Sequence, residues 1–153
     1  MRYFVFALIM ILAGVPLMPT ANAAAAQGRY MVPAPSWNHP RRIVFQIDSG
    51  KPARMNLVLN NVNNIIKYYG QDNVKVAVVA FGPGLPTLLK TSPVAARVES
   101  LTAYSDVSLL ACRNTMRKMH KTKADLLPGI KTVPTGVASL VEHQMAGWTY
   151  IAP

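Results

Sequence analysis

The feature that most constrains the fold is a regular alternation of short apolar runs with helical segments from residue 42 onward. The runs are rich in valine, isoleucine and leucine and are bounded by turn residues, so each is predicted to be a strand. The predicted strands cover residues 42–47, 74–80, 107–111, 131–133 and 148–151. Because strands and helices alternate, the sequence predicts an α/β fold with a parallel sheet covered by helices on both faces.

The segments between the strands carry helical patterns. In the first one, Met55, Val58, Val62 and Ile65 recur at three- and four-residue steps and form one apolar face, and Gly70 ends the helix. Ser92-Pro93 is a helix start, with serine as the N-cap and proline in the first turn. The predicted helices cover residues 53–69, 85–89, 93–101, 113–121 and 136–147.

The amino-terminal segment has the pattern of an export signal. Arg2 is followed by an apolar run over residues 3–17, and Ala21-Asn22-Ala23 has the small-x-small form of a cleavage site. The run is short for a membrane span, although an uncleaved anchor is the alternative. We therefore expect a signal peptide over residues 1–23, cut after Ala23, and a periplasmic or secreted protein without a stable membrane anchor. Residues 24–41, rich in proline, are predicted to be a linker, and residues 42–153 one domain.

The chain is strongly basic, with 16 Lys and Arg against 6 Asp and Glu and a formal net charge of +10. Such a balance favours anions, acidic surfaces or nucleic acid. Export argues against nucleic acid, and the basic run over residues 117–123 lacks the interleaved aromatic residues of a single-strand binding surface. We expect no nucleic-acid partner; a solvated basic surface is the alternative to an anionic ligand.

Cys112 is the only cysteine, so no internal disulfide can form and the fold depends on its core. The residue lies between a predicted strand and a basic helix, where helix amides and nearby cations favour the reactive thiolate. Asp48-Ser49-Gly50 and Phe81-Gly82-Pro83-Gly84 follow two other strands. Since ligands bind at the carboxyl ends of parallel strands, these loops are expected to meet near Cys112. The alternative is a small hydrophobic residue packed in the core.

Seven short segments, taken in order and spacing, resemble the DsrE/DsrF-like family of small sulfur-relay proteins, in particular its exported single-domain members. They are Ile43–Asp48, Leu59–Asn64, Val78–Gly84, Leu110–Met116, Asp125–Gly129, Val133–Val137 and Gln144–Ile151. The resemblance implies a three-layer α/β fold with a mostly parallel five-stranded sheet and assembly into trimers or hexamers. For members that have the cysteine, it also implies a persulfide at the position of Cys112, passed between donor and acceptor proteins.

Under this interpretation Cys112 is the nucleophile and sulfur carrier, in a carrier or binding protein rather than a turnover enzyme, with no cofactor. Arg113 and Arg117 are predicted to stabilise the anion or receive an acidic partner. Asn60 and Asn64 are predicted to hydrogen-bond groups near the pocket; the alternative is that they are solvated polar residues of a helix or tie a strand to a loop.

Two other hypotheses remain open. Cys112, Met116, Met119 and His120 share one predicted helix face, and thiolate with thioether ligands suits Cu(I). The other hypothesis is a structural or binding module with a packed Cys112 and no turnover. The three histidines have no ligand spacing, Gly82-Pro83-Gly84 lacks the form of a phosphate loop, and no carboxylate pair suggests hydrolysis. The aromatic strand at residues 148–151 is predicted to pack either in a subunit interface or within its own subunit.

Overall fold

In the computed structural model, the described residues 33–104 and 106–153 contain one parallel sheet with the strand order β4-β3-β2-β1-β5. The strands are β1 (Arg41–Ile47), β2 (Val74–Ala80), β3 (Val107–Cys112), β4 (Lys131–Val133) and β5 (Thr149–Ile151). Each neighbouring pair is parallel. The predicted α/β class with a five-stranded sheet is confirmed, and the sheet is parallel throughout.

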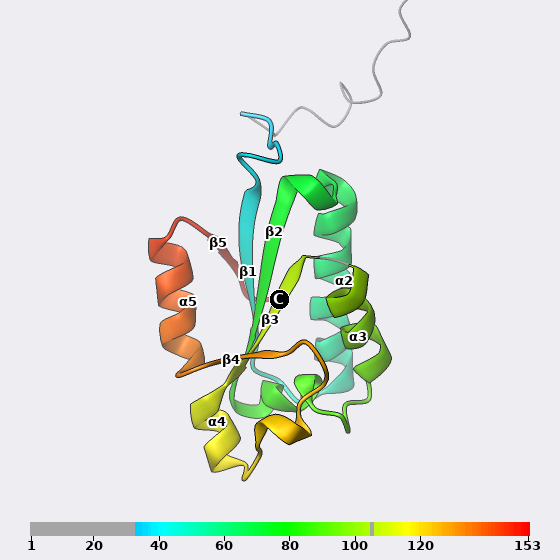
Figure 1. Cartoon of the computed structure of the whole chain (residues 1–153), viewed down its shortest axis with the longest axis vertical. Helices are drawn as coiled ribbons and strands as arrows, with labels where there is room; N and C mark the ends of the chain where they lie inside the picture. The colour runs from blue at the N-terminus through cyan, green and yellow to red at the C-terminus, as the bar shows by residue number, and fades with distance from the viewer. Residues whose placement is uncertain (1–32, 105) are drawn as a thin grey trace, which may run out of the picture. The chain divides into compact units, whose positions relative to one another are not determined.

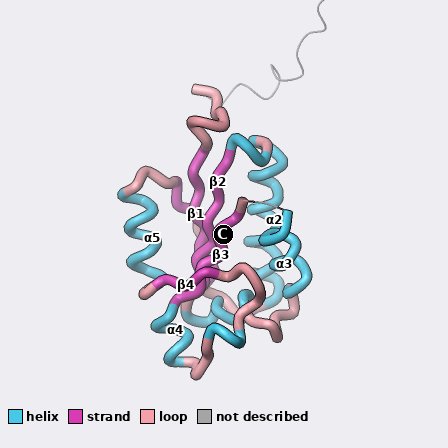
Figure 2. Tube along the Cα trace, in the orientation of Figure 1, coloured by secondary structure: helices cyan, strands magenta, loops and turns pink. Residues whose placement is uncertain are grey.

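Helices connect the strands and form the outer layers. The helices are α2 (Pro52–Tyr69), α3 (Ala95–Tyr104), α4 (Arg113–Lys118) and α5 (Gly136–Met145), with 3₁₀ segments η2 (Gln71–Asn73), η3 (Gly82–Leu88) and η4 (Lys123–Asp125). Figure 1 shows α2 and α3 on one side of the sheet and α5 on the other. Figure 2 shows the same three layers, with the strands between the helices.

The two faces of the sheet are covered very unequally. On the first face, inward residues such as Phe45 and Val78 pack against Met55 and Leu59 of α2 and Val98 of α3 in the larger core cluster. On the second face, a small cluster of buried residues packs beneath α5, which contributes Leu140. Its buried members are Val44, Ala77, Val79, Leu110 and Leu140, with Phe81, Val133 and Trp148 packed against them. Both clusters lie within the compact unit Pro35–Pro153, so this unit carries its own core.

The start of the α3 turn follows the capping pattern expected from the sequence. The Ser92 hydroxyl accepts a hydrogen bond from the Val94 N–H at 3.3 Å, and the Ser92 carbonyl accepts one from Ala95 at 3.2 Å. These bonds satisfy donors that have no partner within a helix's first turn. The predicted helix at 85–89 is instead a 3₁₀ segment that already begins at Gly82.

Three predicted helix ends differ from the structure: α3 continues to Tyr104, α5 ends at Met145, and α4 is shortened. The helix predicted at 113–121 ends at Lys118, because Met119 leaves helical geometry and His120 takes a φ of 53°. Positive φ is uncommon for a residue with a side chain, and it turns the chain back toward η4.

The predicted signal peptide at residues 1–23 lies outside the described residues, as does most of the predicted linker. From Pro35 the linker is ordered in this structure: Ser36 and His39 form a bridge, with the His39 N–H donating to the Ser36 carbonyl at 3.0 Å. Among the described residues, no helix combines the length and apolarity that crossing a membrane requires.

Candidate functional site

Cys112 is the last residue of β3 and the N-cap of α4. Along β3, Leu109 and Ala111 belong to the larger core cluster, while Leu110 belongs to the cluster beneath α5. Because side chains alternate between the faces of a strand, Cys112 lies on the α5 side, where the cover is thin. The residue is only 3% exposed, yet it is not sealed in the core.

Cys112 forms part of the wall of a cavity of about 320 Å³. The wall comes from three loops that follow β2, β3 and β4. It consists of Phe81, Gly82, Cys112, Asn114, Thr115, Lys118, Thr135, Gly136 and Val137. The buried thiol therefore borders a space large enough for a small molecule or an extended side chain.

The sulfur atom lies among hydrogen-bond donors. The backbone N–H of Gly136, the first residue of α5, donates to Cys112 Sγ at 3.1 Å. The hydroxyl of Thr115 also donates to the sulfur. Thr115 Oγ1 in turn accepts a hydrogen bond from the Gly82 N–H at 2.9 Å. Gly82, Thr115 and Gly136 thus connect the loops after all three strands to one sulfur atom.

These donors favour the thiolate. Burial by itself raises the pKa of Cys112, because the charged form is poorly solvated. Hydrogen bonding by the Thr115 hydroxyl and by the backbone N–H groups of Thr115, Gly136 and Asn114 outweighs burial and holds the pKa below its ordinary value. A lowered pKa raises the fraction of the form that attacks sulfur.

The close approach of the Gly136 N–H requires a glycine. A Cβ at position 136 would lie 2.8 Å from Cβ of Phe81 and 3.0 Å from its ring. Phe81 itself lines the cavity and packs against the cluster under α5. Any larger residue at 136 would have to displace either the donor or the aromatic wall.

The predicted basic residues have unequal places. Arg117 does not line the cavity, but it donates to Oδ1 of Asn114, which does, at 2.5 Å. Arg113 is exposed on α4 and does not line the cavity. The cation in the wall is Lys118, which the sequence analysis did not single out.

The predicted asparagines are not near Cys112. Asn60 and Asn64 lie on α2, across the sheet from the α5 face. Asn60 Oδ1 accepts a hydrogen bond from Arg97 at 2.7 Å. Asn64 lines a separate cavity of about 180 Å³ beside Phe45 and Ile151. The structure therefore brings neither residue to the cavity that holds the thiol.

The loop Asp48-Ser49-Gly50 was expected at this cavity, and it does not line it. It lies behind the wall instead. The Phe81 N–H donates to the Ile47 carbonyl at 3.2 Å, and a Cβ at Gly84 would overlap that same carbonyl oxygen. The third loop at the cavity is the one after β4, Thr135-Gly136-Val137.

The four residues of the copper hypothesis do not converge. Met116 is buried in the larger core cluster and Met119 packs against it, whereas Cys112 faces the α5 side. His120 lies beyond the end of α4. Within the described part of the chain, no group of three or more His, Cys, Asp or Glu side chains is placed to hold a metal ion.

Sequence reasoning placed the Phe81–Gly84 loop near Cys112, and Phe81 and Gly82 do line the cavity, but it did not single out Thr115, Gly136 or Lys118. One signal was available. Thr135-Gly136 follows a predicted strand as Cys112 does, and the carboxyl ends of parallel strands share one edge. Thr115 is three residues after Cys112, the N3 position that faces an N-cap side chain.

Comparison with known proteins finds a matching family and similar solved structures. Residues 41–153 match the DsrE/DsrF-like family. The protein of unknown function MTH1491 from Methanobacterium thermoautotrophicum is 35% identical, over 74% of this chain and 99% of its own, with a TM-score of 0.70. The ychN protein from E. coli shares the fold at 13% identity, with the same coverage of 74% and 99% and a TM-score of 0.57. No curated protein gives a significant match.

Proposed function

Because the chain belongs to the DsrE/DsrF-like family, we propose that Cys112 takes up a sulfane sulfur and holds it as a persulfide for an acceptor thiol. Membership confirms the resemblance inferred from the motifs, and this family is associated with sulfur relay. A family fold alone does not establish an activity, so the proposal depends on the chemistry of the site.

One observation supports the proposal above the others: Cys112 Sγ lines a cavity while Gly136 N–H, at 3.1 Å, and the Thr115 hydroxyl donate to it. A structural cysteine needs neither a cavity nor donors. A sulfur carrier needs both, because the thiolate must form and the donor must reach it.

The step conserves atoms and electrons without a further oxidant. The Cys112 thiolate attacks the outer sulfur of a persulfide or polysulfide donor, R–S–SH. A new S–S bond forms at Sγ, the S–S bond of the donor breaks, and its electron pair leaves on R–S⁻. The proton stays on the transferred sulfur. In the second half, an acceptor thiolate attacks that outer sulfur and Cys112 leaves as thiolate, assisted by the same hydrogen-bond donors.

The test is the intact mass of the purified protein after incubation with polysulfide. We expect a gain of one sulfur atom that a reductant reverses and that is absent in Cys112→Ser. No gain in the native protein, together with no alkylation of its thiol, would refute the carrier function and leave a binding or structural module. Alkylation without a gain of sulfur would also refute it.

We further propose that the protein assembles into a homo-oligomer, a trimer or a hexamer. Val137, Val141 and Met145 recur at four-residue steps on α5 and are 59%, 49% and 80% exposed. An exposed apolar row of this kind is costly in water unless a second surface covers it. Light scattering coupled to size exclusion measures the state directly, and a monomer at micromolar concentration would contradict the proposal.

Export is a separate proposal, supported by the sequence of residues 1–23. We expect the protein from a periplasmic or culture fraction to begin at Ala24. Amino-terminal sequencing distinguishes this from an uncleaved chain, in which Met1 or Arg2 would be found.

A further inference from the structure

A second cavity lies at the opposite end of the sheet from Cys112. Its volume is about 430 Å³, and it lies where β1 and β2 begin. It is lined by Asn38, His39, Pro40, Arg41, Arg42 and Lys75. Arg42 and Lys75 lie on the same face of the sheet at this cavity, and none of its lining residues is acidic. The proposed sulfur chemistry uses none of them.

The fold places the backbones of Arg42 and Lys75 side by side. Arg42 and Lys75 are direct partners in the parallel register of β1 and β2. Gly147, in the turn before β5, has a φ of 80°, and a Cβ there would lie 3.1 Å from Nη2 of Arg42. On the other side, the Ser36–His39 bridge holds the turn that carries Asn38, and Ser36 Oγ donates to Asn38 Oδ1 at 2.7 Å.

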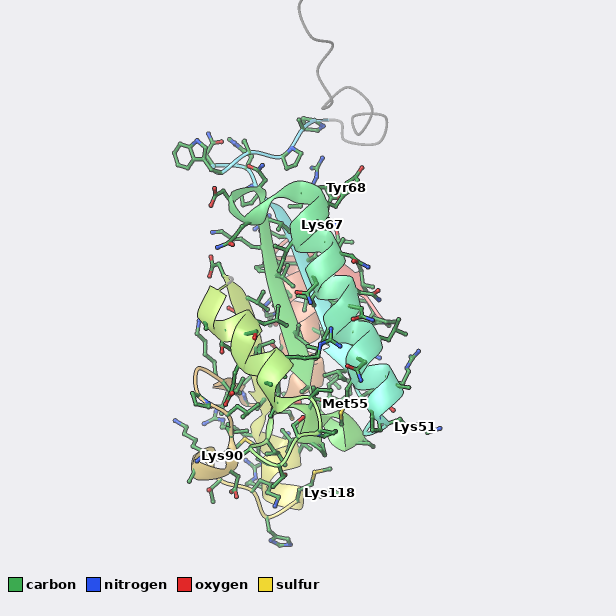
Figure 3. The ribbon with its side chains drawn as sticks, turned by 90° about the vertical axis from the view of Figure 1, so that its right-hand side faces the viewer. Lys51, Met55, Lys67, Tyr68, Lys90 and Lys118 are labelled. Carbon is green, nitrogen blue, oxygen red and sulfur yellow. The ribbon has the colours of Figure 1, made fainter. Side chains whose placement is uncertain are left out.

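The same turn presents a large aromatic side chain to solvent. Trp37 is 78% exposed, although it stands between residues of an ordered bridge. At the end of α2, Tyr68 is 40% exposed and follows Lys67. Figure 3 shows Lys67 and Tyr68 at one end of the molecule, with Lys51, Lys90 and Lys118 toward the other. An exposed tryptophan beside a group of cations is the combination found at membrane–water interfaces.

We propose that the amino-terminal edge of the sheet docks on an anionic phospholipid surface. The cavity receives a lipid phosphate between Arg42 and Lys75, and Trp37 enters the headgroup layer beside it. Each cation near such a surface adds attraction, and the indole adds buried apolar area. Two carboxylates, Asp72 and Asp106, also lie near the amino ends of strands, but neither lines the cavity.

One observation favours a lipid surface over the other anions. A soluble phosphate or an acidic protein tail would explain the cations but not Trp37, which no described core cluster includes.

Docking in this way directs Cys112 away from the bilayer. The strands are parallel, so their carboxyl ends all point to the far side. A seven-residue strand spans about 23 Å, so the thiol cavity would stand clear of the lipid headgroups and remain open to other molecules.

The experiment is vesicle co-sedimentation of the unit Pro35–Pro153, which carries its own core and lacks the apolar run. We expect binding to mixed phosphatidylglycerol–phosphatidylcholine vesicles, weakened by salt, and little binding to phosphatidylcholine alone. Arg42→Gln with Lys75→Gln should weaken binding on the order of tenfold. Trp37→Ala should weaken it several-fold and abolish the blue shift of tryptophan emission on binding.

The matched control is Lys51→Gln with Lys90→Gln, which removes the same charge at the other end and should leave binding within about twofold of the parent. Equal loss in both pairs would mean that net charge alone acts, and would overturn the proposal. So would absence of binding, equal binding to neutral vesicles, or full competition by glycerol phosphate, which would identify a soluble phosphate site. Tighter binding to single-stranded DNA of matched charge would equally overturn it.

Discussion

The two ends of the parallel sheet carry cavities of similar size and opposite chemistry. At the carboxyl end, about 320 Å³ of space borders a thiol held by backbone and hydroxyl donors, with Lys118 as the cation in its wall. At the amino end, about 430 Å³ is bordered by Arg41, Arg42, Lys75 and His39. The first cavity offers an anion hydrogen-bond donors from the backbone and a hydroxyl, whereas the second offers charged side chains.

Chain direction explains this difference. In a parallel α/β fold the helices run back along the strands, so helix N-termini lie at the carboxyl edge and helix C-termini at the amino edge. Free N–H groups and the positive end of the helix dipole therefore gather where Cys112 lies. At the amino edge the free groups are carbonyls, which suit cations such as Lys67 in the last turn of α2. An anion there must be recognised by side chains alone.

The largest effect expected from this comparison is on stability. A Cβ at Gly84 would overlap the Ile47 carbonyl, a backbone atom that cannot move aside, whereas at Gly70 the nearest atom is Asn73 Nδ2 at 3.5 Å. Gly84→Ala should lower the free energy of unfolding by more than about 3 kcal/mol. Gly70→Ala, which forces a side chain into a φ of 83°, should lower it by about 1–2 kcal/mol. Urea unfolding compares the two variants, and equal losses would mean that a Cβ is tolerated no worse at Gly84 than at Gly70.

The next prediction separates the contribution of a backbone hydrogen-bond donor from that of a charged side chain at the thiol cavity. Gly136→Ala would press on Phe81 and move the N–H from Cys112 Sγ, so the thiol should alkylate on the order of tenfold more slowly at pH 7. Lys118→Gln, which removes the wall cation but no donor to sulfur, should change the rate by less than about twofold. Iodoacetamide kinetics on the folded protein measure both. A larger effect from the lysine would mean that charge dominates at this end too.

A smaller effect is expected for the Thr115 hydroxyl. Thr115→Val keeps the shape but removes a donor that lowers the pKa of Cys112, so that pKa should rise and the alkylation rate at pH 7 should fall by about fivefold. Thr115→Ser should retain the native rate. A valine variant with an unchanged pH–rate profile would show that the backbone donors suffice.

The same variant gives a dependence of stability on pH with a definite sign. The folded chain loses the Cys112 proton at lower pH than the unfolded chain, because its pKa is lowered. This contribution to stability is fully present above the pKa of the unfolded thiol and is lost as pH falls through the folded-state pKa. The native protein should therefore gain stability relative to Thr115→Val as the pH rises through that window. A constant difference would refute the role given to the hydroxyl.

Most of the fold could be predicted from the sequence because each element is locally consistent. The apolar runs of β1 and β2 and the periodicity of α2 fix their own boundaries nearly to the residue. The end of α4 could not be predicted, since Met116 and Met119 keep helical spacing while the positive φ of His120 depends on the return to η4.

For the candidate site, the cysteine and one wall loop could be predicted from their place after strands. The remaining wall depends on which face each residue takes and which strands are neighbours. Gly136 reaches Cys112 because β4 pairs with β3, with Val133 opposite Cys112. The order of the strands in the sheet decides which loops become neighbours, and hydrophobic periodicity along the sequence does not reveal that order. The prediction that Asn60 and Asn64 lie at the pocket was wrong because it ignored the two faces of the sheet. Helix α2 covers one face, and the side chain of Cys112 lies on the other.

The smallest effect follows from that difference between faces. Asn60→Ala removes an acceptor for Arg97, a bond on the exposed side of α2, and should lower stability by less than about 1 kcal/mol. Asn64→Ala alters the wall of the small cavity beside Phe45, which is separate from the thiol. Neither change should alter sulfur uptake or the alkylation rate of Cys112. If either variant lowered the alkylation rate of Cys112 more than Thr115→Val does, a change on one face of the sheet would be affecting the thiol on the other. The two faces could then not be treated as independent.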